Sequence, residues 1–320
     1  LVENIAMLYD RGAIRAALIV APKGVYKNWN DIEFPVHLPD HVEHTKVLWD
    51  PSITKKKQME LDTLFDGGED LKILIMNVEA FSTKKGLDFA YSFLNIFLGR
   101  ALIGIDESTT IKSPTAKRTK NILKIGELAK YRRILTGSPV TKSPLDLYTQ
   151  CKFLDPFYLD EASYYSFRAR YANMVKRNFG GRSVQLVTSY RRLDELAEKL
   201  DKFSYRVLKE DCLDLPPKVF TTRTVDLSDE QKKMYITMKN AAIAEQDGKI
   251  MSSMSALTTL LRLHQITCGH MKTDDGEVLT IKNNRLTALM DCLEETDGKV
   301  IIWANYREDI KNIVESLKKA

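Results

Sequence analysis

The stretch Ala101-Leu-Ile-Gly-Ile-Asp-Glu-Ser-Thr109 joins a short, apolar run to two adjacent acidic residues. Three further short runs rich in Ile, Leu and Val lie on either side of it, at Ala16–Ala21, Ile73–Met76 and Arg133–Leu135. Each run ends in turn or polar residues and is followed by a segment with helical periodicity. Apolar strands that alternate with helices are typical of a parallel sheet covered on both faces, so the first half of the chain predicts an α/β fold.

The length of the chain is compatible with about two domains. Its 320 residues are 44% hydrophobic and 28% charged, which excludes a wholly disordered chain. The alternation of strands and helices stops near residue 154, and Leu215-Pro-Pro-Lys218 marks a second boundary because consecutive prolines interrupt regular structure. We therefore expect an α/β lobe over 1–154, a helical, basic protrusion and linker over 155–214, and a further α/β unit that begins within 215–320.

The last of these parts predicts mainly helices. Ser228 and Gln231 have the spacing of a capping box, which opens a helix. Leu257, Leu260, Leu261 and His264 share one helical face, which indicates packing in a core. The expected elements are helices over about 228–246, 255–267 and 285–295, an apolar strand at Val300–Trp303, and a final helix that runs to Lys319.

Bulk properties exclude several classes of protein. The 48 Lys and Arg against 43 Asp and Glu give a net charge of +5, which permits a nucleic-acid partner without requiring one. The longest uncharged apolar stretch, 89–99, is shorter than the roughly 20 residues that cross a bilayer, so no membrane partner is expected. Four widely spaced cysteines without a CxxC pair argue against a disulfide framework and favour a reducing compartment. Cys268-Gly-His270 lacks a second pair of metal ligands, so a turn is expected there.

Asp106 and Glu107 are the strongest candidates for catalysis. Two acids directly after a buried strand are costly unless a cation or water uses them, and such a pair suits nucleotide hydrolysis. Asp106 would hold Mg²⁺ through its water shell, and Glu107 would orient or deprotonate the attacking water. An ordinary Asp-Glu pair in a solvated turn is the alternative that the dipeptide alone leaves open.

Two other strand ends carry unusual residues. Thr136, Gly137 and Ser138, followed by Pro139, predict a rigid loop that could contact the acidic pair and relay its state. A plain strand-to-helix turn is the alternative. Pro22-Lys23-Gly24 could place backbone N–H groups against a phosphate. Ligands bind beyond the carboxyl ends of parallel strands, so these loops belong to the same predicted edge.

Basic residues concentrate in two stretches that contain no acid, 108–126 and 163–193, and the second also contains several tyrosines. Such stretches predict a surface that follows the phosphates of DNA, and two solvated faces are the alternative. The candidate DNA-binding residues are Lys23, Lys112, Lys117, Arg118, Lys120, Arg168, Arg170, Lys176, Arg177 and Arg182.

Taken in order, these residues resemble the Swi/Snf-type family of DNA-dependent ATPases within helicase superfamily two, over nearly the whole chain. Asp106-Glu107-Ser108-Thr109 stands where the family has its DEAH box, and Leu135–Pro139 is similar to motif III. The other matching segments are Leu18–Pro22 with Trp29 (motif Ia), Ile73–Phe81 (motif Ib), Leu147–Pro156 (the segment after motif III), Leu215–Lys218, Leu227–Gln231 with Tyr235 and Leu261–Ile266 (the start of the second lobe), and Lys299–Trp303 (motif IV).

The chain also departs from the family pattern. The phosphate-binding loop GxxxxGK[ST] does not occur, because Gly248-Lys249 and Gly298-Lys299 are followed by Ile and Val. We expect that loop before Leu1, and motifs V and VI with the arginine finger after Ala320. Since an arginine finger is worth about 10³–10⁵ in rate, these 320 residues by themselves are expected to be nearly inert. Ser108 and Thr109 replace the usual Ala-His. The chain therefore has no histidine at the position from which the family's histidine contacts motif III.

The resemblance implies a RecA-like lobe, a helical protrusion and the start of a second RecA-like lobe, with ATP and Mg²⁺ bound between the lobes of the intact protein. It implies catalysis by Asp106 and Glu107, coupling through Thr136, Gly137 and Ser138, and translocation on double-stranded DNA through backbone contacts. A DNA- or partner-binding module without ATPase activity and an RNA-directed helicase of the same superfamily are the alternatives. The compact lobes favour a bacterial or phage member, hence a cytoplasmic location, or a nuclear one in a eukaryote.

Overall fold

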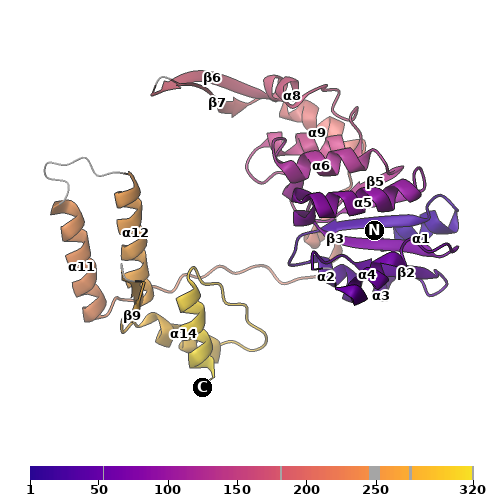
Figure 1. The fold of residues 1–320 in the computed structure, drawn as a ribbon. Helices are drawn as coiled ribbons and strands as arrows, with labels where there is room; N and C mark the ends of the chain where they lie inside the picture. Colours follow the sequence, from indigo (N-terminus) through magenta and orange to yellow (C-terminus); the bar gives the residue numbers. More distant parts are fainter. Residues whose placement is uncertain (53, 181, 245–252, 274–275, 319–320) are drawn as a thin grey trace. The chain divides into compact units, whose positions relative to one another are not determined.

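The structure is a computed structural model that describes all residues except 53, 181, 245–252, 274–275 and 319–320. The chain folds as two compact units, 1–212 and 213–320, and each is described by itself (Figure 1). In the described residues, no helix combines the length and the apolar character that a membrane span requires.

The first unit is built on a five-stranded, fully parallel sheet with the strand order β2-β3-β1-β4-β5, so the predicted α/β class is confirmed. Each predicted apolar run of this unit lies within a strand or overlaps one. The edge strand β2 was not predicted, because only one of its five residues is buried and it begins His-Thr-Lys. The strands are β1 (Ala16–Ala21), β2 (His44–Leu48), β3 (Leu71–Asn77), β4 (Ala101–Ile105) and β5 (Tyr131–Ile134).

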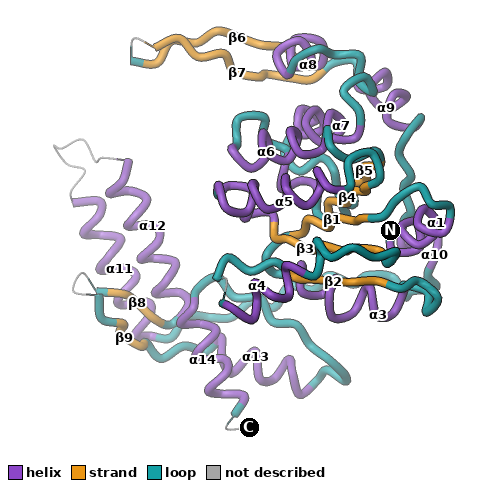
Figure 2. The backbone as a smooth tube through the Cα atoms, turned by 45° about the vertical axis from the view of Figure 1, so that its right-hand side comes forward, coloured by secondary structure: helices purple, strands orange, loops and turns teal. Residues whose placement is uncertain are grey.

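Helices cover both faces of this sheet. In β1, Leu18 and Val20 face one core and Ala17 and Ile19 face the other, which is why the strand is apolar at every position. Figure 2 shows α5 and α6 on one side of the sheet and α1 and α3 on the other. The short and long helices of this part are α1 (Val2–Asp10), α2 (Tyr26–Asn28), the π-helix η1 (Trp29–Glu33), α3 (Phe34–His37), α4 (Lys55–Asp62), η2 (Val78–Ser82), α5 (Lys84–Ile96), η3 (Ser108–Ile111), α6 (Lys117–Gly126), η4 (Pro144–Asp146) and α7 (Leu147–Leu154).

The predicted helical protrusion is partly wrong, because a β-hairpin forms its centre. The order is α8 (Tyr164–Tyr171), β6 (Ala172–Phe179), β7 (Arg182–Tyr190), α9 (Leu193–Asp201) and α10 (Lys209–Cys212). The two strands pair antiparallel around a turn at Gly180, whose φ of +53° suits glycine. A third core packs Tyr148 of α7 against Phe167 of α8 and contains Leu196 of α9, so this segment is part of the first unit.

The second unit contains α11 (Asp229–Ala244), α12 (Ser253–Cys268), the hairpin of β8 (His270–Lys272) and β9 (Val278–Thr280), α13 (Arg285–Glu294) and α14 (Arg307–Leu317). The predicted capping box is confirmed: Gln231 N–H donates to Ser228 Oγ at 3.2 Å, and Ser228 N–H donates to Gln231 Oε1 at 3.0 Å. The four predicted helices are present, although residues 245–246 and 319 lie outside the described part.

Two expectations for this unit are wrong. Val300–Trp303 forms no strand, because a strand needs a hydrogen-bonded neighbour and none of the described residues pairs with it. The side chain of Trp303 is accordingly 90% exposed. Leu257 and Leu260 are 68% and 64% exposed, so the apolar face of α12 lies at the surface of this unit and is not core. The expected turn at Cys268–His270 is present, with Gly269 at φ +87°.

Candidate active site

The loops that carry the candidate catalytic residues meet at one edge of the sheet. β1, β4 and β5 are neighbours in the parallel sheet, so their carboxyl ends lie side by side. The backbone continues this pairing beyond the strands: Asp106 N–H donates to Val20 O at 2.8 Å, and Leu135 N–H donates to Ile105 O at 2.8 Å. The structure therefore brings the acidic pair and the Thr136–Ser138 loop together.

Both carboxylate oxygens of Asp106 accept a hydrogen bond. The indole Nε1–H of Trp29 donates to Oδ2 at 2.9 Å, and the backbone N–H of Glu107 donates to Oδ1 at 2.9 Å. Trp29 is buried and Asp106 is half-buried. Two donors on a half-buried carboxylate fix its rotamer, and the remaining lone pairs can accept further bonds.

Glu107 is held in the left-handed region of backbone conformation, with φ +49° and ψ +59°. A non-glycine residue there costs free energy, and such residues cluster at functional sites. The side chain of Glu107 is exposed. The chain thus turns sharply after Asp106 and presents the second carboxylate to solvent at the edge of the sheet.

A cavity of about 500 Å³ opens beside Asp106. The first residues of α1 line it, so the N-terminal end of a helix and the acidic residue border the same space. A helix N-terminus suits phosphate and a carboxylate suits hydrated Mg²⁺, so this lining fits the phosphate end of a nucleotide with its Mg²⁺. The described residues contain no group of three or more His, Cys, Asp or Glu that could hold a metal, so they offer no all-protein metal cage. The other lining residues are Val25, Asn28, Trp29, Glu33, His37 and Leu135.

The loop after β5 is held by its own hydrogen bonds at the tip. Ser138 N–H donates to Thr136 Oγ1 at 3.2 Å, and Ser138 Oγ donates to Val140 O at 2.9 Å. Gly137 and Ser138 are exposed, and Thr136 is half-buried. The tip therefore has a defined shape but little packing around it.

Two contacts at this edge were not predicted from the sequence. Ser108 Oγ donates at 2.7 Å to Gln150 Oε1 of α7, and both residues are fully buried. The second contact is an ion pair of 3.7 Å between Lys112 and Asp146. Burial opposes ionisation of Asp146, but donors from Lys142 and Thr141, together with Lys112, hold the pKa of its carboxyl below the ordinary value. The partners are 42 and 34 positions apart in the sequence, so no local sequence pattern indicates either contact.

The candidate DNA-binding residues fall into two groups. Five are exposed: Lys23, Lys117, Lys120, Lys176 and Arg177. The others that can be described have protein partners. Lys112 pairs with Asp146, Arg118 Nε donates to Thr110 O at 2.9 Å, Arg168 donates to Gln185 Oε1 at 3.1 Å, and Arg170 pairs with Glu195 at 2.8 Å. The side chain of Arg182 lies outside the described residues.

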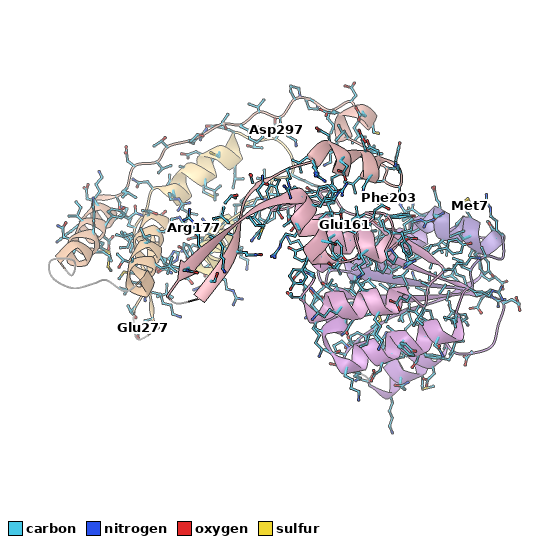
Figure 3. The ribbon with its side chains drawn as sticks, turned by 90° about the horizontal axis from the view of Figure 1, so that it is seen from above. Met7, Glu161, Arg177, Phe203, Glu277 and Asp297 are labelled. Atoms are coloured by element: carbon cyan, nitrogen blue, oxygen red, sulfur yellow. The ribbon has the colours of Figure 1, made fainter. Side chains whose placement is uncertain are left out.

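Arg170 stabilises the base of the hairpin. Its guanidinium lies 2.8 Å from Glu195 of α9 and 3.7 Å from Glu161, and Tyr171 OH donates to the same Glu195 oxygen at 2.8 Å. Figure 3 shows Glu161 at this base and Arg177 farther out on the hairpin. Arg170 therefore joins α8 to α9, whereas Arg177 is exposed to solvent.

The sheet order, the helices on both faces and the acidic pair at the carboxyl edge define a RecA-like α/β protein. The chain belongs to the SNF2-related domain family, whose sequence pattern matches residues 2–272. The resemblance to the Swi/Snf type is thereby confirmed.

Known proteins similar to the chain are mostly much longer. TATA-binding protein-associated factor MOT1 of Saccharomyces cerevisiae is 30% identical over 200 residues, which are 60% of this chain and 10% of MOT1. Helicase-like transcription factor of Mus musculus is 28% identical over 269 residues, which are 79% of this chain and 24% of that protein. The solved Sulfolobus solfataricus SWI2/SNF2 ATPase core in complex with dsDNA is 23% identical, with a TM-score of 0.48 and coverage of 98% of this chain and 62% of that one. The chain thus spans a quarter or less of these two curated relatives.

Proposed function

We propose that the protein containing this chain is a DNA-dependent ATPase of the Swi/Snf type that translocates on double-stranded DNA. The observation that carries the proposal is the geometry of the acidic pair, with Asp106 oriented by two donors in the lining of a cavity and Glu107 presented to solvent by a left-handed turn. Membership of the SNF2-related domain family supports the same activity.

The roles of the two acids follow from their positions. Asp106 would hold the hydrated Mg²⁺ that accompanies ATP, and that ion would neutralise charge on the phosphates. Glu107 would accept a hydrogen bond from the attacking water and orient it, since its carboxylate is exposed and water can reach it. Trp29 keeps the Asp106 carboxylate in one rotamer, so that the pair is in place before the nucleotide binds.

The rest of the chain would convert hydrolysis into movement on DNA. Residues 1–154 would form the nucleotide-binding lobe, 155–214 a protrusion that faces DNA, and 215–320 the start of the second lobe. Thr136, Gly137 and Ser138 would move with the state of the acidic pair, because their loop shares its edge of the sheet. The exposed cations on α6 and on the hairpin would contact phosphates, which suits a motor that must act on any sequence. Its location would follow the DNA: the cytoplasm of a bacterial or phage-infected cell, or the nucleus of a eukaryote.

Two assays on the intact protein test this function. The first is steady-state ATP hydrolysis without nucleic acid, with double-stranded DNA and with RNA, and we expect only DNA to stimulate it. The second is ATP-dependent displacement of a third strand from a DNA triplex, which reports translocation without strand separation. Stimulation by RNA alone would assign an RNA-directed helicase. DNA binding without hydrolysis would assign a binding module, and either result contradicts the proposal.

A further inference from the structure

Ser108 is connected to both ends of the loop that follows β5, directly at its start and through Gln150 at its end. Its backbone N–H donates to Leu135 O at 3.0 Å, where the loop begins. Its side chain donates to Gln150 Oε1 at 2.7 Å, and Gln150 Nε2–H donates to Pro139 O at 2.8 Å, where the loop ends. One residue, directly after the acidic pair, therefore connects to the start and the end of 135–139.

The orientation of the Gln150 amide is fixed by its hydrogen bonds. Its second N–H donates to Asp146 O at 2.8 Å, one turn earlier in the chain, and its oxygen accepts from Ser108. All three directed groups of the amide are occupied, and both side chains have no exposed surface. An amide with two donors and one acceptor in use cannot rotate without losing a buried hydrogen bond, so its orientation is fixed.

The tip of the loop contrasts with its ends. Among the residues that the structure describes, Thr136, Gly137 and Ser138 bond only within their own segment, and Gly137 and Ser138 are exposed. A displacement of the acidic turn that moved Ser108 would shift Leu135 through the backbone bond and Pro139 through Gln150. The tip would move together with Leu135 and Pro139, because it is short and hydrogen bonds hold both of these ends.

We propose that Ser108 and Gln150 form a positioning pair that couples the Asp106–Glu107 turn to the Thr136–Ser138 loop. Neither residue touches the nucleotide in this scheme; each acts through the loop. The proposal rests on the proposed function, because the coupling has a measurable effect only in a DNA-stimulated ATPase. It predicts a specific defect: hydrolysis without DNA persists, whereas stimulation by DNA is lost.

Three variants of the intact protein test the pair. Gln150→Met keeps the length of the side chain and removes its three polar contacts. The double variant Ser108→Ala/Gln150→Met also removes the hydroxyl that Gln150→Met leaves buried without a partner. Thr149→Val is the matched control, since Thr149 Oγ1 lies on the same helix and makes an equally buried hydrogen bond of 2.7 Å, to Ile111 O and not to the loop.

We expect Gln150→Met to lower DNA-stimulated kcat by about tenfold, the effect of losing one buried hydrogen bond, with basal kcat and the KM for ATP within about twofold of wild type. The double variant should regain the part of the thermal stability that the buried, unpaired Ser108 hydroxyl costs Gln150→Met, but it should not regain stimulation. Thr149→Val should lose stability and keep stimulation.

Restored stimulation in the double variant would show that the pair has only a structural role and would overturn the inference. Normal stimulation in Gln150→Met would overturn it as well, and so would an equal loss of stimulation in Thr149→Val. In each of these cases the wild type is still stimulated, so the proposed function stands. A wild type without DNA stimulation contradicts the proposed function itself and the inference with it.

Discussion

The indole of Trp29 and the carboxylate of Asp106 are joined by a hydrogen bond of 2.9 Å across 77 positions of the sequence. Trp29 begins the π-helix η1 after β1, and Asp106 follows β4, so the bond connects the loops of two adjacent strands. Because Asp106 also accepts from the N–H of Glu107, the orientation of the whole acidic pair depends on this tryptophan.

Replacement of Trp29 by Phe should therefore impair hydrolysis more than folding. The variant keeps an aromatic ring in the core and removes the N–H that orients Asp106. We expect kcat for ATP to fall about 10- to 100-fold, the range for a displaced catalytic group, with about 1 kcal/mol lost from the free energy of unfolding. Steady-state hydrolysis and urea unfolding of the intact protein measure the two effects.

Trp49→Phe is the matched control for this variant. Trp49 is 2% exposed, and its Nε1–H has no hydrogen-bond partner among the residues that the structure describes. The substitution also shrinks a buried ring but removes no bond to the acidic pair. We expect hydrolysis to stay within about twofold of wild type, since a smaller ring at position 49 leaves the bonds of Asp106 in place. Equal losses in both variants would contradict the role given to Trp29.

The exposed cations of the hairpin should contribute to DNA affinity without specifying sequence. Replacing Lys176 and Arg177 by Ala should weaken binding of unrelated duplexes alike and reduce the slope of log K against log salt by about 2, near 0.9 per phosphate contact. Lys55→Ala/Lys56→Ala removes the same charge from exposed positions of α4 and should leave the slope unchanged. Equal slopes for the two double variants would show that the hairpin is not part of the DNA-binding surface.

Glu195 should make stability depend on pH in the acid range. The hydrogen bonds from Arg170 and Tyr171 lower the pKa of this carboxyl to about 2, against an ordinary 4.5, and Lys199 at 3.8 Å adds to the effect. Because the pKa is lower in the folded state, the stabilisation is complete above pH 4.5 and is lost as the pH falls toward 2. Over that range, the unfolding temperature of wild type should fall more steeply than that of Glu195→Gln. Parallel curves would contradict this.

Cys151 should resist alkylation in the folded protein. It is 2% exposed, and burial raises the pKa of its thiol to about 12, so very little thiolate forms. Cys212 is exposed. With iodoacetamide at about pH 8.5, the ordinary thiol pKa, Cys212 should react in the native state and Cys151 only after unfolding, as mass spectrometry of the peptides would show. Rapid native labelling of Cys151 would mean that the α7 region opens readily.

The sequence predicted the central strands well, because a strand buried on both faces must be apolar at every position. β2 was missed for the same reason, since an edge strand that begins with His44, Thr45 and Lys46 does not look apolar. The hairpin of β6 and β7 had a usable signal in the glycine pair Gly180-Gly181, which the many basic residues around it obscured. Val300–Trp303 has the composition of a strand, but composition does not supply a neighbouring strand to pair with.

The candidate site was predicted at the level of single loops. Asp106, Glu107 and the 136–138 loop follow apolar strands, so their shared edge followed from the topology of parallel sheets. Contacts between loops could not be predicted, because Trp29, Ser108 and Gln150 reach their partners across many positions and the sequence around each does not indicate which residue that partner is. The ion pairs of the basic residues could not be predicted either. Arg170 lies among other basic residues in the sequence, but its guanidinium is paired with Glu195.

The central claim is that Glu107 orients the attacking water, and one comparison of variants tests it most directly. ATP turnover of the intact protein should be measured at saturating double-stranded DNA for wild type, Glu107→Gln and Glu127→Gln, whose exposed carboxylate at the end of α6 lies outside the site. We expect Glu107→Gln to lose about 10²–10⁴-fold in kcat while still binding ATP, because the residue orients the attacking water and does not hold the nucleotide. Glu127→Gln should match wild type. Turnover in Glu107→Gln equal to that of wild type would contradict the proposed mechanism.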